Sequence, residues 1–126
     1  MSRSFKINRV SHVSFLVSDI ACAVEFYCDF LGMPLDSTRP DLGFPGAWLL
    51  VGEQAIHLLE LANPDPVTGR PAHGGHDRHV AFVIDDVAAL RQVLQSKNIE
   101  YSCSHSGRKA LFFRDPDGNA LEFVEQ

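Results

Sequence analysis

The sequence predicts an α+β fold made of two βαβββ modules, because one pattern of strand, helix and hairpin occurs twice along the chain. HVSFLVSDIA at residues 12–21 corresponds to HVAFVIDDVA at residues 79–88, and five of the ten positions are identical. In each copy, apolar and polar residues alternate as in a half-buried strand and then take the three- and four-residue spacing of a helix. A hairpin pattern follows in both halves, at residues 47–60 and 110–125.

The two predicted modules span residues 8–61 and 77–126 and share one domain, residues 1–126. A chain of 126 residues with 45% hydrophobic content is long enough for a single core. Residues 62–76 are rich in proline and glycine, and we interpret them as the link between modules rather than as a domain boundary. The modules are expected to place curved mixed sheets side by side, so that the sheets form a cup.

Local signals predict the remaining elements of each module. Each helix begins after a side chain that can accept hydrogen bonds from the first helical turn: Ser18 or Asp19 in the first module, and Asp85 or Asp86 in the second. Gly32 is suited to end the first helix, because glycine adopts positive φ easily. DPDGN at residues 115–119 is a strong turn signal between the last two strands. One less regular strand is expected in each module, around residues 33–40 and 99–104.

The composition excludes several classes of partner. The net charge is -5 and basic residues are scattered, so we expect binding to neither nucleic acid nor an anionic membrane surface. No apolar run reaches the about 20 residues of a membrane span, and the N-terminal residues predict no secretory signal. Cys22, Cys28 and Cys103 form no C-x-x-C motif, and we interpret Cys22 and Cys28 as buried or half-buried apolar side chains. The sequence therefore predicts a reduced, cytoplasmic protein with small-molecule or protein partners.

Four residues that can ligate a metal occupy equivalent positions of the two modules. His12 corresponds to His79 in the first strand, and His57 corresponds to Glu122 in the last strand. A single strand histidine is usually a hydrogen-bonded core or edge residue, and duplication alone could copy it. Duplication does not account for Glu122, a carboxylate in an apolar strand that is costly to bury without a cation or a partner. We therefore predict that the four residues bind one divalent metal ion; the alternative is a vestigial pocket without metal.

The other candidate side chains carry weaker signals. His73 and His76 lie in the glycine-rich link and His105 lies in a polar turn, where solvated side chains are the default expectation. Trp48 lies in a predicted strand, and we interpret it as a core residue rather than as the wall of a pocket. Basic residues of the second half could attract an anionic substrate, although such surface charges are usually only solvated: Arg70, Arg78, Arg108, Lys109 and Arg114.

Four segments of the chain together resemble the vicinal oxygen chelate superfamily: HVSFLVSDIACAVEFYCDFLGM at residues 12–33, IHLLEL at 56–61, DRHVAFVIDDVAAL at 77–90 and FFRDPDGNALEF at 112–123. This superfamily includes glyoxalase I, fosfomycin-resistance proteins, methylmalonyl-CoA epimerase, extradiol dioxygenases and bleomycin-resistance proteins. The resemblance covers nearly the whole chain. It implies a glyoxalase-like fold of paired βαβββ modules around a divalent metal with an open coordination position. The implied chemistry stabilises an oxyanion or activates a chelated oxygen.

The resemblance also assigns individual residues. His12, His79 and Glu122 fall where fosfomycin-resistance proteins and extradiol dioxygenases have two histidines and a carboxylate. His57 falls at the fourth position, where glyoxalase I has glutamate, so an imidazole replaces one of two flanking carboxylates. Leu16 stands where bacterial glyoxalase I typically has an arginine for the glutathione carboxylate. The first departure affects the catalytic base of a glyoxalase-type proton transfer, and the second affects the binding of glutathione.

The resemblance implies a metal-dependent lyase or isomerase of the glyoxalase type. One divalent metal per site, Ni, Zn, Mn or Fe, would act as a Lewis acid on a small oxygen-chelating substrate, and Glu122 or His57 would move a proton. One alternative is an extradiol-type dioxygenase, since two histidines and one carboxylate suit Fe(II). Another is a non-enzymatic protein that binds a drug or metabolite, as bleomycin-resistance proteins do. Members of this family form their cups between paired modules, often from two subunits. The resemblance therefore also predicts a homodimer.

Overall fold

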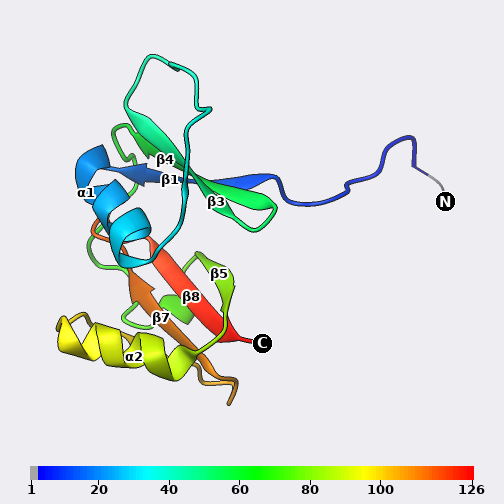
Figure 1. The fold of residues 1–126 in the computed structure, drawn as a ribbon. Coiled ribbons are helices and arrows are strands. Elements are labelled where there is room, and N and C mark those ends of the chain that lie inside the picture. Colours follow the sequence, from blue (N-terminus) through cyan, green and yellow to red (C-terminus); the bar gives the residue numbers. More distant parts are fainter. Residues whose placement is uncertain (1–2) are drawn as a thin grey trace. The chain divides into compact units, whose positions relative to one another are not determined.

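The computed structural model describes residues 3–126, and the chain divides between Asn63 and Pro64 into two compact units (Figure 1). The first unit contains β1 (His12–Val17), α1 (Ile20–Val24) continued by a π-helix (Glu25–Phe30), β2 (Leu35–Asp36), β3 (Gly46–Val51) and β4 (Gln54–Glu60). The second unit contains a 3-10 helix (Gly74–His76), β5 (His79–Ile84), α2 (Val87–Ser96), β6 (Ser102–Cys103), β7 (Ala110–Arg114) and β8 (Ala120–Glu125).

Each unit contains one mixed sheet, and the strand order is the same in both. In the first unit the order is β1-β4-β3-β2, with β1 parallel to β4 and the other neighbours antiparallel. In the second unit the order is β5-β8-β7-β6, with β5 parallel to β8. A parallel pair needs a crossover connection, and the helix after β1 or β5 begins that connection. The predicted α+β fold of two βαβββ modules is confirmed.

The helix of the first unit begins where two carboxylates accept its free backbone N–H groups. Asp19 Oδ1 accepts from the N–H of Ala21 at 2.9 Å and of Cys22 at 3.2 Å. Glu60 Oε1, at the end of β4, accepts from the N–H of Ile20 at 2.9 Å. Because Glu60 belongs to the sheet, its bond also joins the start of the helix to the sheet. Gly32 follows the π-helix with φ of +80°, as predicted for the residue that ends it.

The helix of the second unit begins in the same way. Asp86 Oδ1 accepts from the N–H of Ala89 at 3.0 Å, and Glu125 Oε1, in β8, accepts from the N–H of Val87 at 3.0 Å. Of the capping residues predicted as alternatives, the side-chain caps are thus Asp19 and Asp86. Glu60 and Glu125 lie at equivalent ends of β4 and β8. The two modules therefore also share this contact between strand and helix, which we did not predict from the sequence.

Each unit has a buried apolar core between its helix and one face of its sheet. In the first unit this core contains Phe15, Val17, Tyr27, Leu49 and Leu58. In the second unit it contains Phe82, Leu90, Leu94, Leu111 and Leu121. The first strands expose their other face at His12, Ser14, His79 and Ala81. The prediction that the histidines lie opposite the core face is therefore confirmed for both strands.

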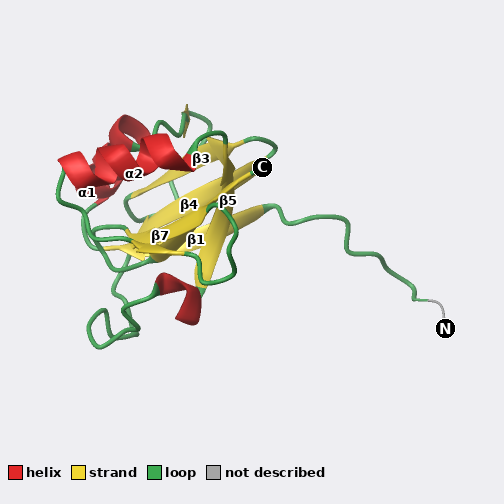
Figure 2. Cartoon of the chain, turned by 90° about the horizontal axis from the view of Figure 1, so that it is seen from below, coloured by secondary structure: helices red, strands yellow, loops and turns green. Residues whose placement is uncertain are grey.

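The end of the link is packed onto the second sheet. Figure 2 shows the 3-10 helix and α2 on opposite faces of this sheet. A Cβ atom added at Gly74 would lie 3.3 Å from Cβ of Phe112 and 3.5 Å from Cβ of Ala120, so a larger side chain would lift the link from the sheet. The 3-10 helix therefore holds nearby link residues at fixed positions over the face that carries His79.

Some details differ from the sequence predictions. The helical spacing after β1 is interrupted, because residues Glu25–Phe30 form a π-helix. Cys22 is exposed rather than buried, while Cys28 is half-buried, and the described cysteines are free thiols. The less regular strands, β2 and β6, are short. Over residues 3–126, no helix is both long and apolar enough to cross a membrane.

Candidate metal centre

In the first unit, the rings of His12 and His57 form a stacked pair. The two residues lie on the parallel strands β1 and β4, where Ser14 is the register partner of His57. Their ring centroids are 3.8 Å apart and the ring planes differ by 14°. Trp48, the register partner of His57 on β3, also stacks on the His57 ring, at 4.5 Å and 10°. Trp48 is half-buried, so the interpretation of this residue as a core side chain is not confirmed.

The surroundings of His57 favour its neutral form. Burial lowers the pKa of His57, and the nearby side chains of His12 and Arg39 lower it further. A neutral imidazole keeps a lone pair on one ring nitrogen, and this lone pair can bind a metal or accept a proton. The lowered pKa of His57 therefore favours the form that either predicted role requires.

In the second unit, His79 and Glu122 contact each other directly. His79 Nε2 lies 3.0 Å from Glu122 Oε1, and His79 Nδ1 lies 2.9 Å from the backbone oxygen of Asp77. Since a carbonyl oxygen only accepts, Nδ1 donates and Nε2 faces the carboxylate. As an imidazolium, His79 forms an ion pair with Glu122; as a neutral ring, Nε2 and Oε1 direct lone pairs into the same space. The second arrangement is typical of a metal-ligating histidine that a carbonyl orients.

Glu122 also has a second charged partner. Arg108 Nη2 lies 3.0 Å from Glu122 Oε2, and Arg108 Nε donates to the hydroxyl of Ser106 at 3.1 Å. The Glu122 side chain is 4% exposed and the Arg108 side chain is 57% exposed. We predicted that a buried Glu122 needs a cation or a partner, and Arg108 is such a partner. The burial of this carboxylate therefore does not by itself identify a metal ligand.

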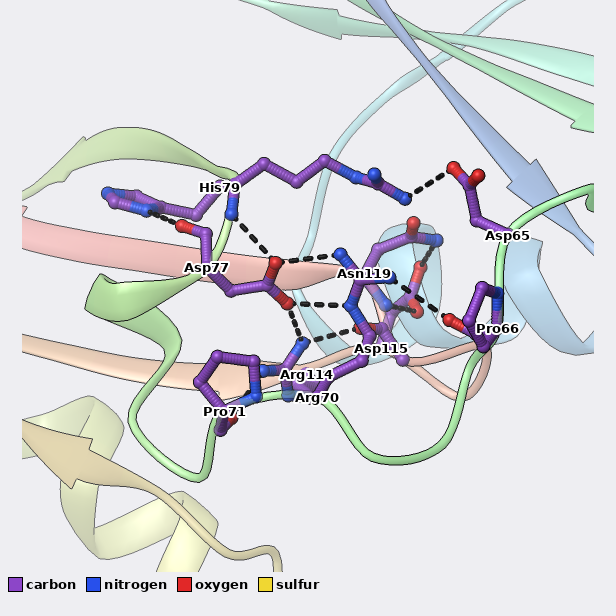
Figure 3. Close-up of polar contacts among 11 residues, drawn as sticks. Asp65, Pro66, Arg70, Pro71, Asp77, His79, Arg114, Asp115 and Asn119 are labelled. Carbon is purple, nitrogen blue, oxygen red and sulfur yellow. Dashed lines mark hydrogen bonds and ion pairs between the residues drawn. The ribbon is translucent and has the colours of Figure 1, made fainter.

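Asp77, which orients His79 through its backbone, is held by two arginines (Figure 3). Arg70 donates from Nε and Nη2 to the two carboxylate oxygens, both at 2.7 Å, and Arg114 Nη1 donates to Oδ2 at 2.9 Å. Hydrogen bonds from Arg70 and then from Arg114 hold the pKa of the Asp77 carboxyl well below its usual range. Arg70 and Arg114 are thus structural partners of Asp77, unlike the solvated charges that the sequence suggested.

The histidines that we expected to be solvated lie together in the second unit. One ring nitrogen of each of His73, His76 and His105 lies within 4.8 Å of the others. His73 is half-buried and its Nδ1 lies 2.6 Å from the hydroxyl oxygen of Ser102. Burial, His105 and His76 lower the pKa of His73. For His73, the expectation of a solvated loop residue is therefore wrong.

The second unit also contains a cavity of about 750 Å³. Its lining includes Ser102 and Phe112, which contact His73, together with Gly74, Tyr101 and Arg114. None of the three cluster histidines lines it, and neither do His79 and Glu122. Phe112, which lines the cavity, contacts the rings of both His73 and His79.

The structure brings the predicted ligands together in two pairs, His12 with His57 and His79 with Glu122. That all four bind one ion stays a prediction. The contact of Arg108 with Glu122 and the three-histidine cluster were not predicted from the sequence. The His73-x-x-His76 spacing in a glycine-rich segment was an available signal, whereas nothing in the sequence joined His105 to it.

Comparisons with known proteins agree on a single family. Residues 9–123 match the model of the "Glyoxalase/Bleomycin resistance protein/Dioxygenase superfamily". The chain is 32% identical to the uncharacterized protein YaeR of Escherichia coli (strain K12), over 95% of this chain and 98% of that protein. It is 30% identical to Glyoxylase I 4 of Arabidopsis thaliana, over 92% and 70%. The solved structure of a glyoxalase family protein from Bacillus anthracis superimposes with a TM-score of 0.79 at 25% identity, covering 98% and 99% of the two chains.

Proposed function

Because the chain belongs to the glyoxalase/bleomycin resistance protein/dioxygenase superfamily, we propose that it is a divalent-metal-dependent enzyme of the glyoxalase type. The proposed metal ligands are His12, His57, His79 and Glu122, and the four residues together would bind one ion. Mixed imidazole and carboxylate ligands without thiolate suit Ni, Zn, Mn or Fe(II). The proposed substrate is a small molecule with neighbouring oxygen atoms that can chelate the ion.

The geometry of His79 and Glu122 is the observation that carries this proposal. The carbonyl of Asp77 engages Nδ1 of His79, and Nε2 and Glu122 Oε1 lie 3.0 Å apart. The repeat relates this pair to His12 and His57, whose rings also lie on the face of a parallel strand pair that is opposite the core. The donor set and the orientation of His79 therefore fit a divalent ion. When bound, the metal would supply Lewis-acid polarisation of a substrate oxygen.

Two of the proposed ligands are suited to move a proton. Burial lowers the pKa of His57, which favours its neutral form, and the Trp48 ring stacks on its imidazole. Glu122, as a carboxylate paired with Arg108, can accept one proton. General acid–base catalysis needs such a group within hydrogen-bond reach of the substrate carbon or oxygen. We assign the proton transfer to His57 or Glu122.

Arg108 gives the proposed site a cation that can reach solvent. Its guanidinium group contacts Glu122 while its side chain is 57% exposed. A guanidinium presents several N–H donors in a plane, which matches a carboxylate or phosphate group. We propose that Arg108 binds an anionic group of the substrate. The hydrogen bond from Arg108 Nε to Ser106 would hold the guanidinium in position.

Metal analysis and proton exchange test this proposal together. Protein purified without chelator should contain metal, and His79→Ala should contain much less. Metal-loaded protein in deuterium oxide should exchange the carbon-bound hydrogen of small 2-hydroxycarbonyl compounds, and His57→Asn or Glu122→Gln should slow this exchange. Glu53→Gln, an exposed carboxylate in the β3–β4 turn, is the control and should behave as wild type. Equal metal content in wild type and His79→Ala would remove His79 from the site.

One observation favours a second candidate function, a metal-free protein that binds a small molecule. Arg108 balances the charge of Glu122 at 3.0 Å, so this part of the site is complete without an ion. In that case wild type would bind no metal at the proposed site. Its Arg108→Met variant would lose affinity for anionic ligands without any change in metal content.

A further inference from the structure

Three imidazoles of the second unit lie together outside the proposed centre. His73 directly precedes the 3-10 helix that ends at His76, and His105 lies in the turn between β6 and β7. The rings of His73 and His105 are stacked at 4.2 Å, and those of His73 and His76 meet edge to face at 4.9 Å. One nitrogen of each ring lies within 4.8 Å of the others. Segments separated in sequence therefore bring three side chains that can ligate a metal to one place.

We propose that His73, His76 and His105 form a second metal site, which takes a borderline transition-metal ion such as Zn²⁺, Ni²⁺, Co²⁺ or Cu²⁺. Imidazole nitrogen suits these ions, whereas Mg²⁺ and Ca²⁺ prefer oxygen ligands. Three histidine ligands leave one position of a tetrahedral site open for water or another ligand. The site uses none of the ligands proposed for the centre formed by His12, His57, His79 and Glu122.

Ser102 orients the ring of His73. Its hydroxyl oxygen lies 2.6 Å from Nδ1 of His73, so Nε2 is the nitrogen left for a metal. Phe112 contacts the same ring edge to face at 4.7 Å and restricts its rotation. A histidine ligand usually has a partner at its other nitrogen, and loss of that partner typically weakens metal binding about ten- to a hundredfold. Ser102 therefore occupies the position expected of such a partner.

Gly75 keeps the space beside His73 Nε2 open. A Cβ atom at this position would lie 2.7 Å from Nε2 and 3.3 Å from Cζ of Phe112. The backbone of Gly75 is not in the positive-φ region, so alanine is allowed there by its own conformation. Gly75→Ala therefore obstructs the proposed metal position without removing a ligand.

A modest closure of the cluster would bring the three nitrogens to one ion. Zinc–nitrogen bonds of about 2.0–2.1 Å place tetrahedral ligand atoms about 3.3 Å apart. The largest separation here is 4.8 Å. The stacked ring of His105 must also tilt, because parallel rings direct their lone pairs in parallel. His105 and His76 are exposed, so both side chains can make these movements.

Equilibrium dialysis of the full chain against Zn²⁺ tests the proposal. His105→Asn and His76→Asn should each bind one ion fewer per chain than wild type, or bind that ion at least about tenfold more weakly. Ser102→Ala and Gly75→Ala should lower the affinity for the same ion. Glu53→Gln, an exposed potential ligand in the first unit, is the control and should bind as wild type. Melting curves in chelator verify that each variant is folded.

Glu122→Gln separates this site from the proposed function. If both sites exist, Glu122→Gln and His105→Asn each lose a different ion. If the proposed centre binds no metal, wild type and Glu122→Gln bind the same single ion and only the cluster variants lose it. Nitrogen NMR of wild type should show zinc at Nε2 of His73. Unchanged stoichiometry and affinity in folded His105→Asn and His76→Asn would overturn the proposal.

Discussion

Asp77→Asn should destabilise the second unit strongly, because it breaks a buried ion-pair network. Oδ1 of Asp77 accepts hydrogen bonds from Arg70 Nη2 at 2.7 Å and from the N–H of Arg78 at 2.8 Å. Oδ2 accepts from Arg70 Nε at 2.7 Å and Arg114 Nη1 at 2.9 Å. Asparagine keeps a single acceptor oxygen. Whichever oxygen becomes NH₂, two hydrogen bonds are lost and the new NH₂ group faces two N–H donors.

The expected loss follows from the charge and exposure of these partners. A hydrogen bond to a charged group contributes about 1.5–3 kcal/mol, so two of them set a range of about 3–6 kcal/mol. The arginine side chains are 19% and 25% exposed, so water can partly replace the lost acceptor. We therefore expect the free energy of unfolding to fall by about 3 kcal/mol at neutral pH. Urea unfolding of wild type and variant measures this difference.

The same difference should depend on pH in a defined direction. The folded-state pKa of Asp77 lies below its unfolded value, because hydrogen bonds from Arg70 stabilise the carboxylate. The stabilisation is therefore complete above the unfolded pKa of about 3.9 and is lost as the pH falls through the folded pKa. The gap between wild type and Asp77→Asn should be constant near neutral pH and shrink below about pH 4.

Asp65→Asn is the matched control for this experiment. Asp65 pairs with Arg78 at 2.9 Å, but the two side chains are 50% and 66% exposed. Exposed pairs contribute about 0–1 kcal/mol, so this variant should unfold nearly as wild type does. If Asp77→Asn costs no more than Asp65→Asn, or if its cost does not shrink in acid, the assigned role of the network is wrong.

Three further predictions concern the proposed centre, the helix caps and the assembly. Arg108→Met should raise metal affinity, measured by dialysis, because Arg108 no longer competes with the ion for Glu122; unchanged or weaker binding would contradict this. Asp19→Ala should lower the free energy of unfolding by about 1 kcal/mol, since two N–H groups lose their acceptor, whereas Asp41→Ala, at an exposed loop, should have less effect. The chain should form a homodimer at micromolar concentration, and sedimentation equilibrium with only a 14.0 kDa species would end that proposal.

The repeat predicted the fold well because it encodes backbone pairing. Alternation in the first strands predicted which face is buried, and the structure buries Phe15 and Phe82 while it exposes His12 and His79. Strand register follows from such patterns, since a shift of one residue would turn the apolar face to solvent. The π-helix at Glu25–Phe30 was not predicted, because its side-chain spacing differs little from that of an α-helix over so short a segment.

The site was only partly predictable, because its remaining contacts come from loops. Asp77 and Arg114 form an ion pair although they are 37 residues apart in the sequence, and Arg108 contacts Glu122 from a turn rather than from a strand. Long side chains and irregular backbone give no periodic signal that sequence reasoning can use. For the same reason the link looked like solvated chain, although Gly74 packs against Phe112 and places His73 beside Ser102.

The most direct test of the proposed centre is to measure how much nickel stabilises the protein with and without the Glu122→Gln substitution. Each protein should carry His105→Asn, so that an ion at the second proposed site does not contribute. Nickel at 100 times its dissociation constant should stabilise the parent, and the same chain with Glu53→Gln, by about 2.7 kcal/mol, seen as a higher melting temperature than in chelator. With Glu122→Gln, or with His12→Asn, this rise should be lost. An equal rise in all four proteins would contradict the assignment of Glu122 and His12 as ligands of one ion.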